Sequence, residues 1–147
     1  MQYLFLMLAF LTGVAISIQA GVNSNLRLTL NNPLLASLIS FGTGFFTLLV
    51  VHLSTGGAVP PLATLRSLAW WKWTGGIIGA AYVTTVILAV PRIGTANLVS
   101  LSVAGQLLAA VVLDHYGLLG FAQHPANSWR LLGMGLILAG VWLVVKN

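Results

Sequence analysis

Five stretches of about twenty apolar residues limit the folds open to this chain more than any other feature, because each stretch is long enough to cross a bilayer as a helix. Away from their ends, none of these stretches contains Asp, Glu, Lys, Arg or His. The segments between them carry turn chemistry, as in "STGGAVPP" and "DHYGLLGFAQHPANS". We therefore expect an all-α integral membrane protein with one transmembrane domain over 1–147, whose five transmembrane helices lie near 3–22, 33–53, 71–90, 94–113 and 130–146.

The composition supports a membrane protein and excludes several other classes. Only 5% of the residues are charged and 59% are hydrophobic, whereas soluble domains carry about 25% charged residues. The formal net charge is +5, but the basic residues stand singly between apolar runs, so we expect no nucleic-acid partner. With no cysteine, one acidic residue and no nucleophile or phosphate-binding motif, we expect no enzyme, no cofactor and no metal site.

The first apolar stretch resembles a secretory signal peptide only in part. "SIQA" ends in a small residue, but "MQYLFLMLAF" contains no Lys or Arg, and the apolar run is longer than a usual signal-peptide core. We therefore expect this segment to be a retained span.

The basic residues divide equally between the two sides of the membrane when five spans are threaded in succession. The side of the N-terminus receives Arg66, Lys72 and Arg130, whereas the opposite side receives Arg27, Arg92 and Lys146. Because the Lys and Arg bias of short loops sets orientation, an equal count predicts dual topology, with copies inserted both ways up. An antiparallel homodimer would follow; the alternatives are a misplaced span boundary, or one loop or an insertion factor that dominates insertion.

Two amide-bearing helical faces supply the candidate substrate site. Gln19 and Asn23 end one polar face of the first span, and Ser102 and Gln106 lie on one face of the fourth. A buried carboxamide needs a cross-helix partner or a ligand, although helix packing is the alternative explanation. With Asn97 added, we expect these residues to bind a neutral or anionic substrate, while Arg27 or Arg92 attracts anions at the mouths.

Asp114 is the one acidic residue, and it is followed by His115 at the end of the fourth span. This adjacency makes the two residues a candidate proton relay near the interface. The alternative is an interfacial carboxylate that pairs with Arg130 or with a lipid headgroup and has no role in transport.

Several stretches carry a family resemblance that covers nearly the whole chain. They include "IQAGVNSNLR", "WWKWTGGIIGAAYV", "PRIGTANLVSLSVAGQLLAAVVLDHYGLLG" and "RLLGMGLILAGVWLV". In these the chain resembles the YdcZ-type family of small bacterial membrane proteins, within the drug/metabolite transporter superfamily. The resemblance implies an exporter in the bacterial inner membrane, similar to families that occur as dual-topology homodimers. The small multidrug resistance relatives use a Glu in the first helix, which this chain lacks.

Together these features favour a multi-pass inner-membrane exporter of a small solute. We expect it to work by alternating access as an antiparallel homodimer, with the lipid bilayer, a second copy and a small-molecule substrate as its partners. A dual-topology ion channel and a non-transporting protein that assists a membrane partner remain as alternatives.

Overall fold

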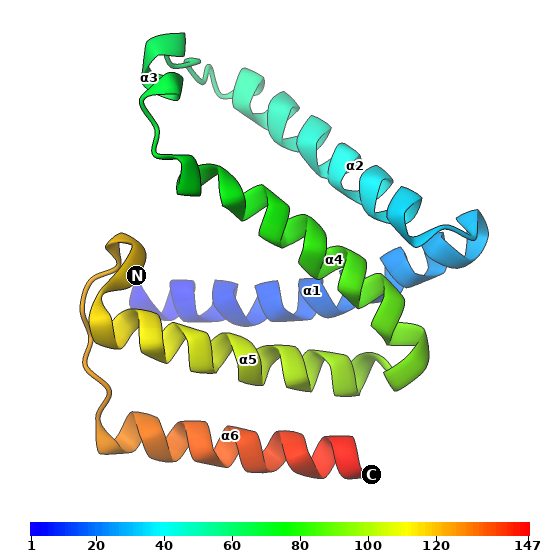
Figure 1. The fold of residues 1–147 in the computed structure, drawn as a ribbon, viewed down its shortest axis with the longest axis vertical. Helices are drawn as coiled ribbons and strands as arrows, with labels where there is room; N and C mark the ends of the chain where they lie inside the picture. The colour runs from blue at the N-terminus through cyan, green and yellow to red at the C-terminus, as the bar shows by residue number, and fades with distance from the viewer. The chain divides into compact units, whose positions relative to one another are not determined.

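The computed structural model describes residues 1–147, and its regular secondary structure is entirely helical (Figure 1). Its five long helices are α1 (Gln2–Leu30), α2 (Pro33–Ser54), α4 (Thr74–Ile93), α5 (Thr95–Tyr116) and α6 (Ser128–Lys146). Three short helices lie in the connections: α3 (Leu62–Arg66), η1 (Trp70–Trp73) and η2 (Leu118–Gly120). All five long helices are long and apolar enough to cross a membrane, which confirms the expected helical fold and number of candidate spans.

The first helix extends further than its apolar run. α1 continues to Leu30, past the expected end near Val22, because "NSNLRLTL" contains no Pro or Gly to stop it. The turn comes at Asn31, which has a left-handed backbone with φ 49°. α2 then begins with Asn32 as its cap, whose side chain accepts a hydrogen bond from the Leu35 N–H at 3.1 Å.

The chain divides into two compact units, residues 1–92 and residues 93–147. Each unit is described by itself below. A single transmembrane domain therefore stays a prediction.

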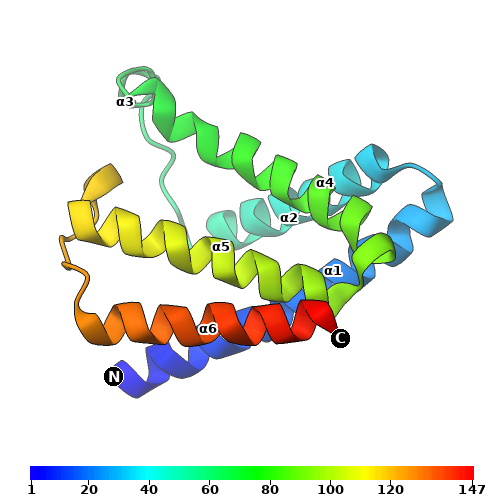
Figure 2. The same cartoon turned by 60° about the horizontal axis from the view of Figure 1, so that its bottom comes forward.

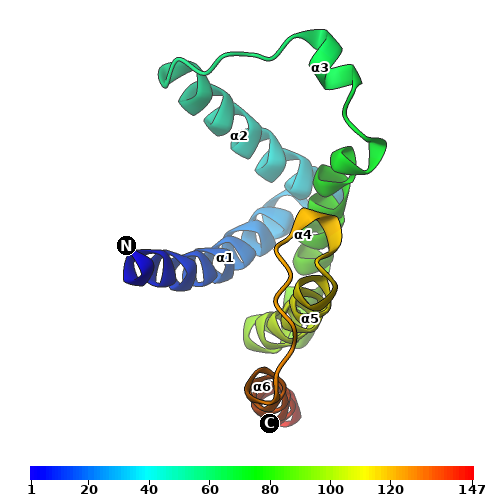
Figure 3. The same ribbon diagram turned by 90° about the vertical axis from the view of Figure 1, so that its left-hand side faces the viewer.

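The first unit has a small core where the end of α1 meets α2 and α4. Ala36, Val83 and Ile87 are buried there, and Leu26 and Leu30 of α1 pack against them. A hydrogen bond of 2.9 Å between the hydroxyls of Ser37 and Thr84 joins α2 to α4 beside this core. From this point α2 and α4 diverge toward α3, as Figure 3 shows.

The second unit is an antiparallel hairpin in which α5 and α6 lie side by side, as both Figure 1 and Figure 2 show. The chain leaves α5 at Gly117, where φ is 60°, a conformation that glycine adopts without strain. Asn127 caps α6 by accepting a hydrogen bond from the Arg130 N–H at 2.9 Å. The hairpin is thus closed by turn and cap residues at both ends of its loop.

Apolar side chains cover most of the outside of these helices. No residue of α6 is buried, and Trp142, Leu136 and Phe45 are among many large apolar side chains that are more than half exposed. Water would solvate such a surface poorly, whereas hydrocarbon covers it without cost. The exposed surface is that of a protein embedded in a bilayer.

Candidate functional site

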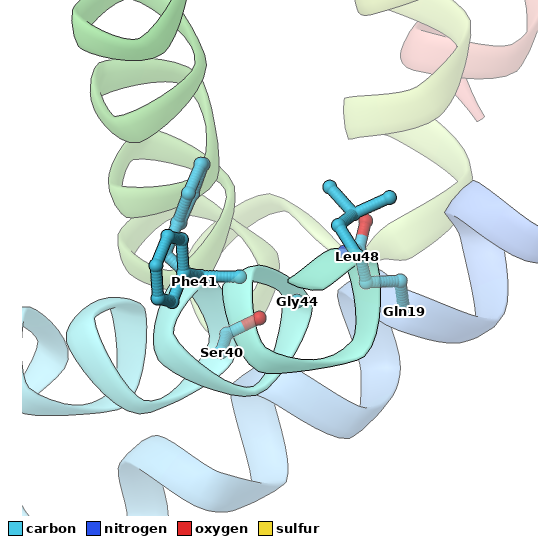
Figure 4. Close-up of a pocket in the computed structure, with 6 residues that line it drawn as sticks. Gln19, Ser40, Phe41, Gly44 and Leu48 are labelled. Carbon is cyan, nitrogen blue, oxygen red and sulfur yellow. The ribbon is translucent and has the colours of Figure 1, made fainter. Parts of the chain in front are cut away.

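A hollow of about 350 Å³ lies between α1 and α2, and it falls at the low end of the usual size range of ligand pockets (Figure 4). α1 contributes Gln19, and α2 contributes a single face whose members recur at three- and four-residue intervals. The residues from that face are Ser40, Phe41, Gly44, Phe45 and Leu48. The hollow is therefore apolar and aromatic, with two polar groups in its lining.

The two polar groups of the hollow have unused hydrogen-bonding capacity. Neither the carboxamide of Gln19 nor the hydroxyl of Ser40 makes a hydrogen bond within the chain. By contrast, the hydroxyls of Thr43 and Thr47 on the same helix donate to backbone carbonyls at 2.9 and 2.8 Å. No charged residue lines the hollow, so its chemistry suits a largely apolar molecule with one hydrogen-bonding end.

The candidates on α1 are placed differently from each other. Gln19 lines the hollow, whereas Asn23, one turn further, is 5% exposed and is not part of its lining. The sequence interpretation missed Phe41, Phe45 and Leu48, because an apolar residue inside a span gives no sign of which helix face it occupies. The four-residue spacing of Ser40 and Gly44 was the available signal, and packing explained it equally well.

Two of the three candidates on α5 share one face. α5 is unbroken from Thr95 to Tyr116, so Ser102 and Gln106 lie about 40° apart around its axis. Asn97 lies about 180° from Gln106 around the same axis. Ser102 and Gln106 therefore share a face, as the sequence predicts, whereas Asn97 lies on the opposite face, and a site that all three line stays a prediction.

The loop after α5 folds back onto the end of that helix. The His124 N–H donates to the carbonyl of Asp114 at 2.8 Å, and Nε2 of Gln123 donates to the carbonyl of His115 at 3.0 Å. In addition, Nδ1 of His115 accepts a hydrogen bond from the Ala126 N–H at 3.1 Å. These bonds satisfy carbonyls that a helix end otherwise leaves free, and they hold the His115 ring as an acceptor at Nδ1.

Asp114 pairs with Arg130 across the hairpin, with 3.5 Å between Oδ2 and Nη1. The same Nη1 donates to the carbonyl of His124 at 3.1 Å. The ion pair considered as the alternative role of Asp114 is thus present. The side chains of Asp114 and His115 share no hydrogen bond, and their proton relay stays a prediction.

Comparison with known proteins identifies the family. Residues 4–143 match the family described as "Putative inner membrane exporter, YdcZ". Inner membrane protein YdcZ of Escherichia coli (strain K12) is 25% identical over 144 residues, which cover 97% of this chain and 96% of that protein. No solved structure matches.

The family match and the five apolar helices agree on the broad class. Both indicate a multi-pass protein of the inner membrane, and the family is one of membrane transporters rather than of enzymes. Because the match spans nearly all of the chain, the chain belongs to the YdcZ family of inner-membrane proteins.

Proposed function

We propose that this chain exports a small solute across the inner membrane by alternating access, as an antiparallel homodimer. The observation that carries the proposal is the balance of basic residues across the ends of the helices. Five successive spans put the α2–α4 connection and the start of α6 on one side, with Arg66, Lys72 and Arg130. The ends of α1, α4 and α6 fall on the other side, with Arg27, Arg92 and Lys146.

This balance has a mechanical consequence for transport. Since no side is favoured, both orientations form, and two oppositely oriented copies can pair. Such a pair reproduces from one sequence the inverted repeats on which alternating-access carriers are built. A two-fold axis in the membrane plane makes the inward-facing and outward-facing states equivalent.

The hollow supports a dimer because one copy lines it only from α1 and α2. A polar solute at membrane depth must be screened from lipid on every side, since hydrocarbon satisfies no hydrogen bond. A second copy would supply the missing walls. In this arrangement each protomer contributes its own polar groups to a shared pathway.

The proposed roles follow from the groups that the hollow presents. The carboxamide of Gln19 and the hydroxyl of Ser40 bind the polar end of the solute, and the rings of Phe41 and Phe45 contact its apolar body. Because no acidic residue lines the hollow, the substrate is neutral or anionic rather than cationic. From the sequence we also propose Asn23, Asn97, Ser102 and Gln106 as substrate-binding residues of the transport pathway outside this hollow, with Arg27 or Arg92 at the mouths.

The topology can be tested with one added cysteine, because the chain has none of its own. A Cys appended after Asn147 leaves every charge in place, and intact cells are labelled with a membrane-impermeant maleimide. We expect about half of the protein to react, and the rest only after permeabilisation. If either all or none of the protein reacts in intact cells, the proposal of an antiparallel homodimer is wrong.

Transport is tested with purified protein in liposomes and a panel of labelled neutral and anionic solutes. A carrier exchanges solute faster when the opposite side holds unlabelled solute, whereas the alternative, a channel, shows no such trans-stimulation. Ser40→Ala should weaken solute affinity, and Ser17→Ala is its matched control, because the Ser17 hydroxyl bonds the Gly13 carbonyl at 3.1 Å. If no solute moves and one stoichiometric partner co-purifies, a role in assisting that partner replaces transport.

A further inference from the structure

A second hollow, of about 270 Å³, lies between α5 and α6 and ends at the ion pair of Asp114 and Arg130. Its remaining walls are side chains or backbone of apolar residues from both helices. They are Leu107, Ala110, Val111, Gly133, Met134 and Ile137. This hollow, called here the hairpin groove, therefore has an apolar body and one charged end.

The charged end of the hairpin groove lies where a membrane meets water. It is formed at the last turn of α5 and the first turn of α6, and Tyr116 and Trp129 flank it with 65% and 81% exposure. Tyr and Trp side chains favour the level of the lipid headgroups. With the ion pair at headgroup level, the apolar walls of the groove extend into the hydrocarbon.

The ion pair leaves much of its hydrogen-bonding capacity unused. Its 3.5 Å separation is longer than the distance of about 2.7–2.9 Å typical of a charge-assisted hydrogen bond. Oδ1 of Asp114 has no partner, and Nε and Nη2 of Arg130 have none either. A cationic donor can therefore approach the carboxylate while an anion approaches the guanidinium.

The complementary ligand is a zwitterion attached to an apolar chain. We propose that the hairpin groove binds a bilayer phospholipid of the phosphatidylethanolamine class. Arg130 binds its phosphate, Asp114 accepts from its primary ammonium group, and an acyl chain lies along Leu107, Val111 and Ile137. This inference depends on the location of the chain in the membrane and is independent of the proposed transport.

The charge distribution of the chain distinguishes this site from other basic positions at the interface. Arg66 and Lys72 form no ion pair, because Asp114 is the one acidic residue of the chain and it pairs with Arg130. Unpaired basic residues attract anionic lipids without regard to headgroup shape. A paired carboxylate and guanidinium instead select a headgroup that carries both charges.

The test uses three lipids with the same dioleoyl chains. Purified protein is equilibrated in micelles with equimolar phosphatidylethanolamine, phosphatidylcholine and phosphatidylglycerol, and bound lipid is counted by native mass spectrometry. We expect phosphatidylethanolamine to be retained about three- to fivefold over either competitor, the upper range for one exposed ion pair. Phosphatidylcholine carries the same charges but has no ammonium N–H to donate, and phosphatidylglycerol has no ammonium. Equal retention of all three lipids would overturn the proposal. A second copy that covered the groove would give this result too, because it would keep every lipid out.

Two variants test whether Asp114 and Arg130 cause the preference for phosphatidylethanolamine. Asp114→Asn should remove the preference for phosphatidylethanolamine over phosphatidylglycerol, and Arg130→Gln should lower retention of all three lipids. Arg66→Gln is the matched control, because it removes an interfacial charge outside the groove and should leave the lipid ratio unchanged. An Asp114→Asn protein that keeps the ratio would also overturn the proposal. If a variant does not fold, the competition among the three lipids on the unaltered chain still tests the proposed preference.

Discussion

The hydrogen bond between Ser37 and Thr84 can be removed without changing the shape of either helix face. Ser37→Ala and Thr84→Val each delete one hydroxyl from the contact of α2 with α4. Each hydroxyl also lies near a carbonyl of its own helix. Oγ of Ser37 is 3.0 Å from the Pro33 carbonyl, and Oγ1 of Thr84 is 2.8 Å from the Ala80 carbonyl.

The expected loss of unfolding free energy follows from the number of hydroxyl hydrogens that Ser37 and Thr84 can donate. Each hydroxyl has one, so only one of the two can donate across the helices while the other donates to its own helix. When either hydroxyl is removed, the survivor donates to its own carbonyl and no donor is left without a partner. Each single variant should therefore lose about 0.6 kcal/mol of unfolding free energy, the average for interhelical hydrogen bonds in membranes. The double variant should lose about the same amount, rather than twice as much.

The measurement is reversible unfolding in mixed micelles with increasing SDS, followed by far-ultraviolet circular dichroism. Thr47→Val is the control, because its hydroxyl bonds only the Thr43 carbonyl of the same helix and should leave the unfolding free energy unchanged. Losses that add in the double variant would contradict the shared bond. A single loss above about 1.7 kcal/mol, the largest measured for such bonds, would show that a buried donor had been left unpaired.

Other outcomes are expected from the charges and from the loop. Replacing Arg66 and Lys72 by Gln leaves one basic residue against three, so the side of the C-terminus should stay in the cytoplasm. Maleimide labelling of a Cys after the last residue in intact cells should then fall from about half toward none, and unchanged labelling would refute the charge-balance argument. His115→Ala removes the acceptor of the Ala126 N–H and should speed hydrogen exchange of that amide, whereas His52→Ala should not. An unchanged exchange rate would show that the loop is held without this bond.

The sequence determined the helices, because the hydrogen bonds of a helix are local and a bilayer requires each spanning segment to satisfy its own backbone. The five apolar runs predicted five candidate spans, and the structure contains them. α1 extends beyond its predicted end. Hydropathy falls at Asn23, but the helix stops only at Asn31, since the intervening residues lack Pro and Gly. Apolar patterning locates a membrane boundary, whereas backbone chemistry locates a helix end.

The candidate site was only partly readable in advance. Gln19 was identified because its amide chemistry is unusual within an apolar run, and it does line a hollow. Asn97 lies on the face of α5 opposite to Gln106, and its part in the site stays a prediction. The contribution of Phe41 and Phe45 depended on which face of α2 meets α1, and the many apolar residues of α2 look alike in sequence.

Tertiary structure alone decided the contacts that join segments distant in the chain. Asp114 had two candidate partners in the sequence, and closure of the α5–α6 hairpin brings Arg130 to its carboxylate. Ser37 and Thr84 carried no sequence signal for each other, because either hydroxyl can be satisfied within its own helix. Local hydrogen bonding and lipid burial make single helices predictable, but which polar groups meet depends on how the helices pack.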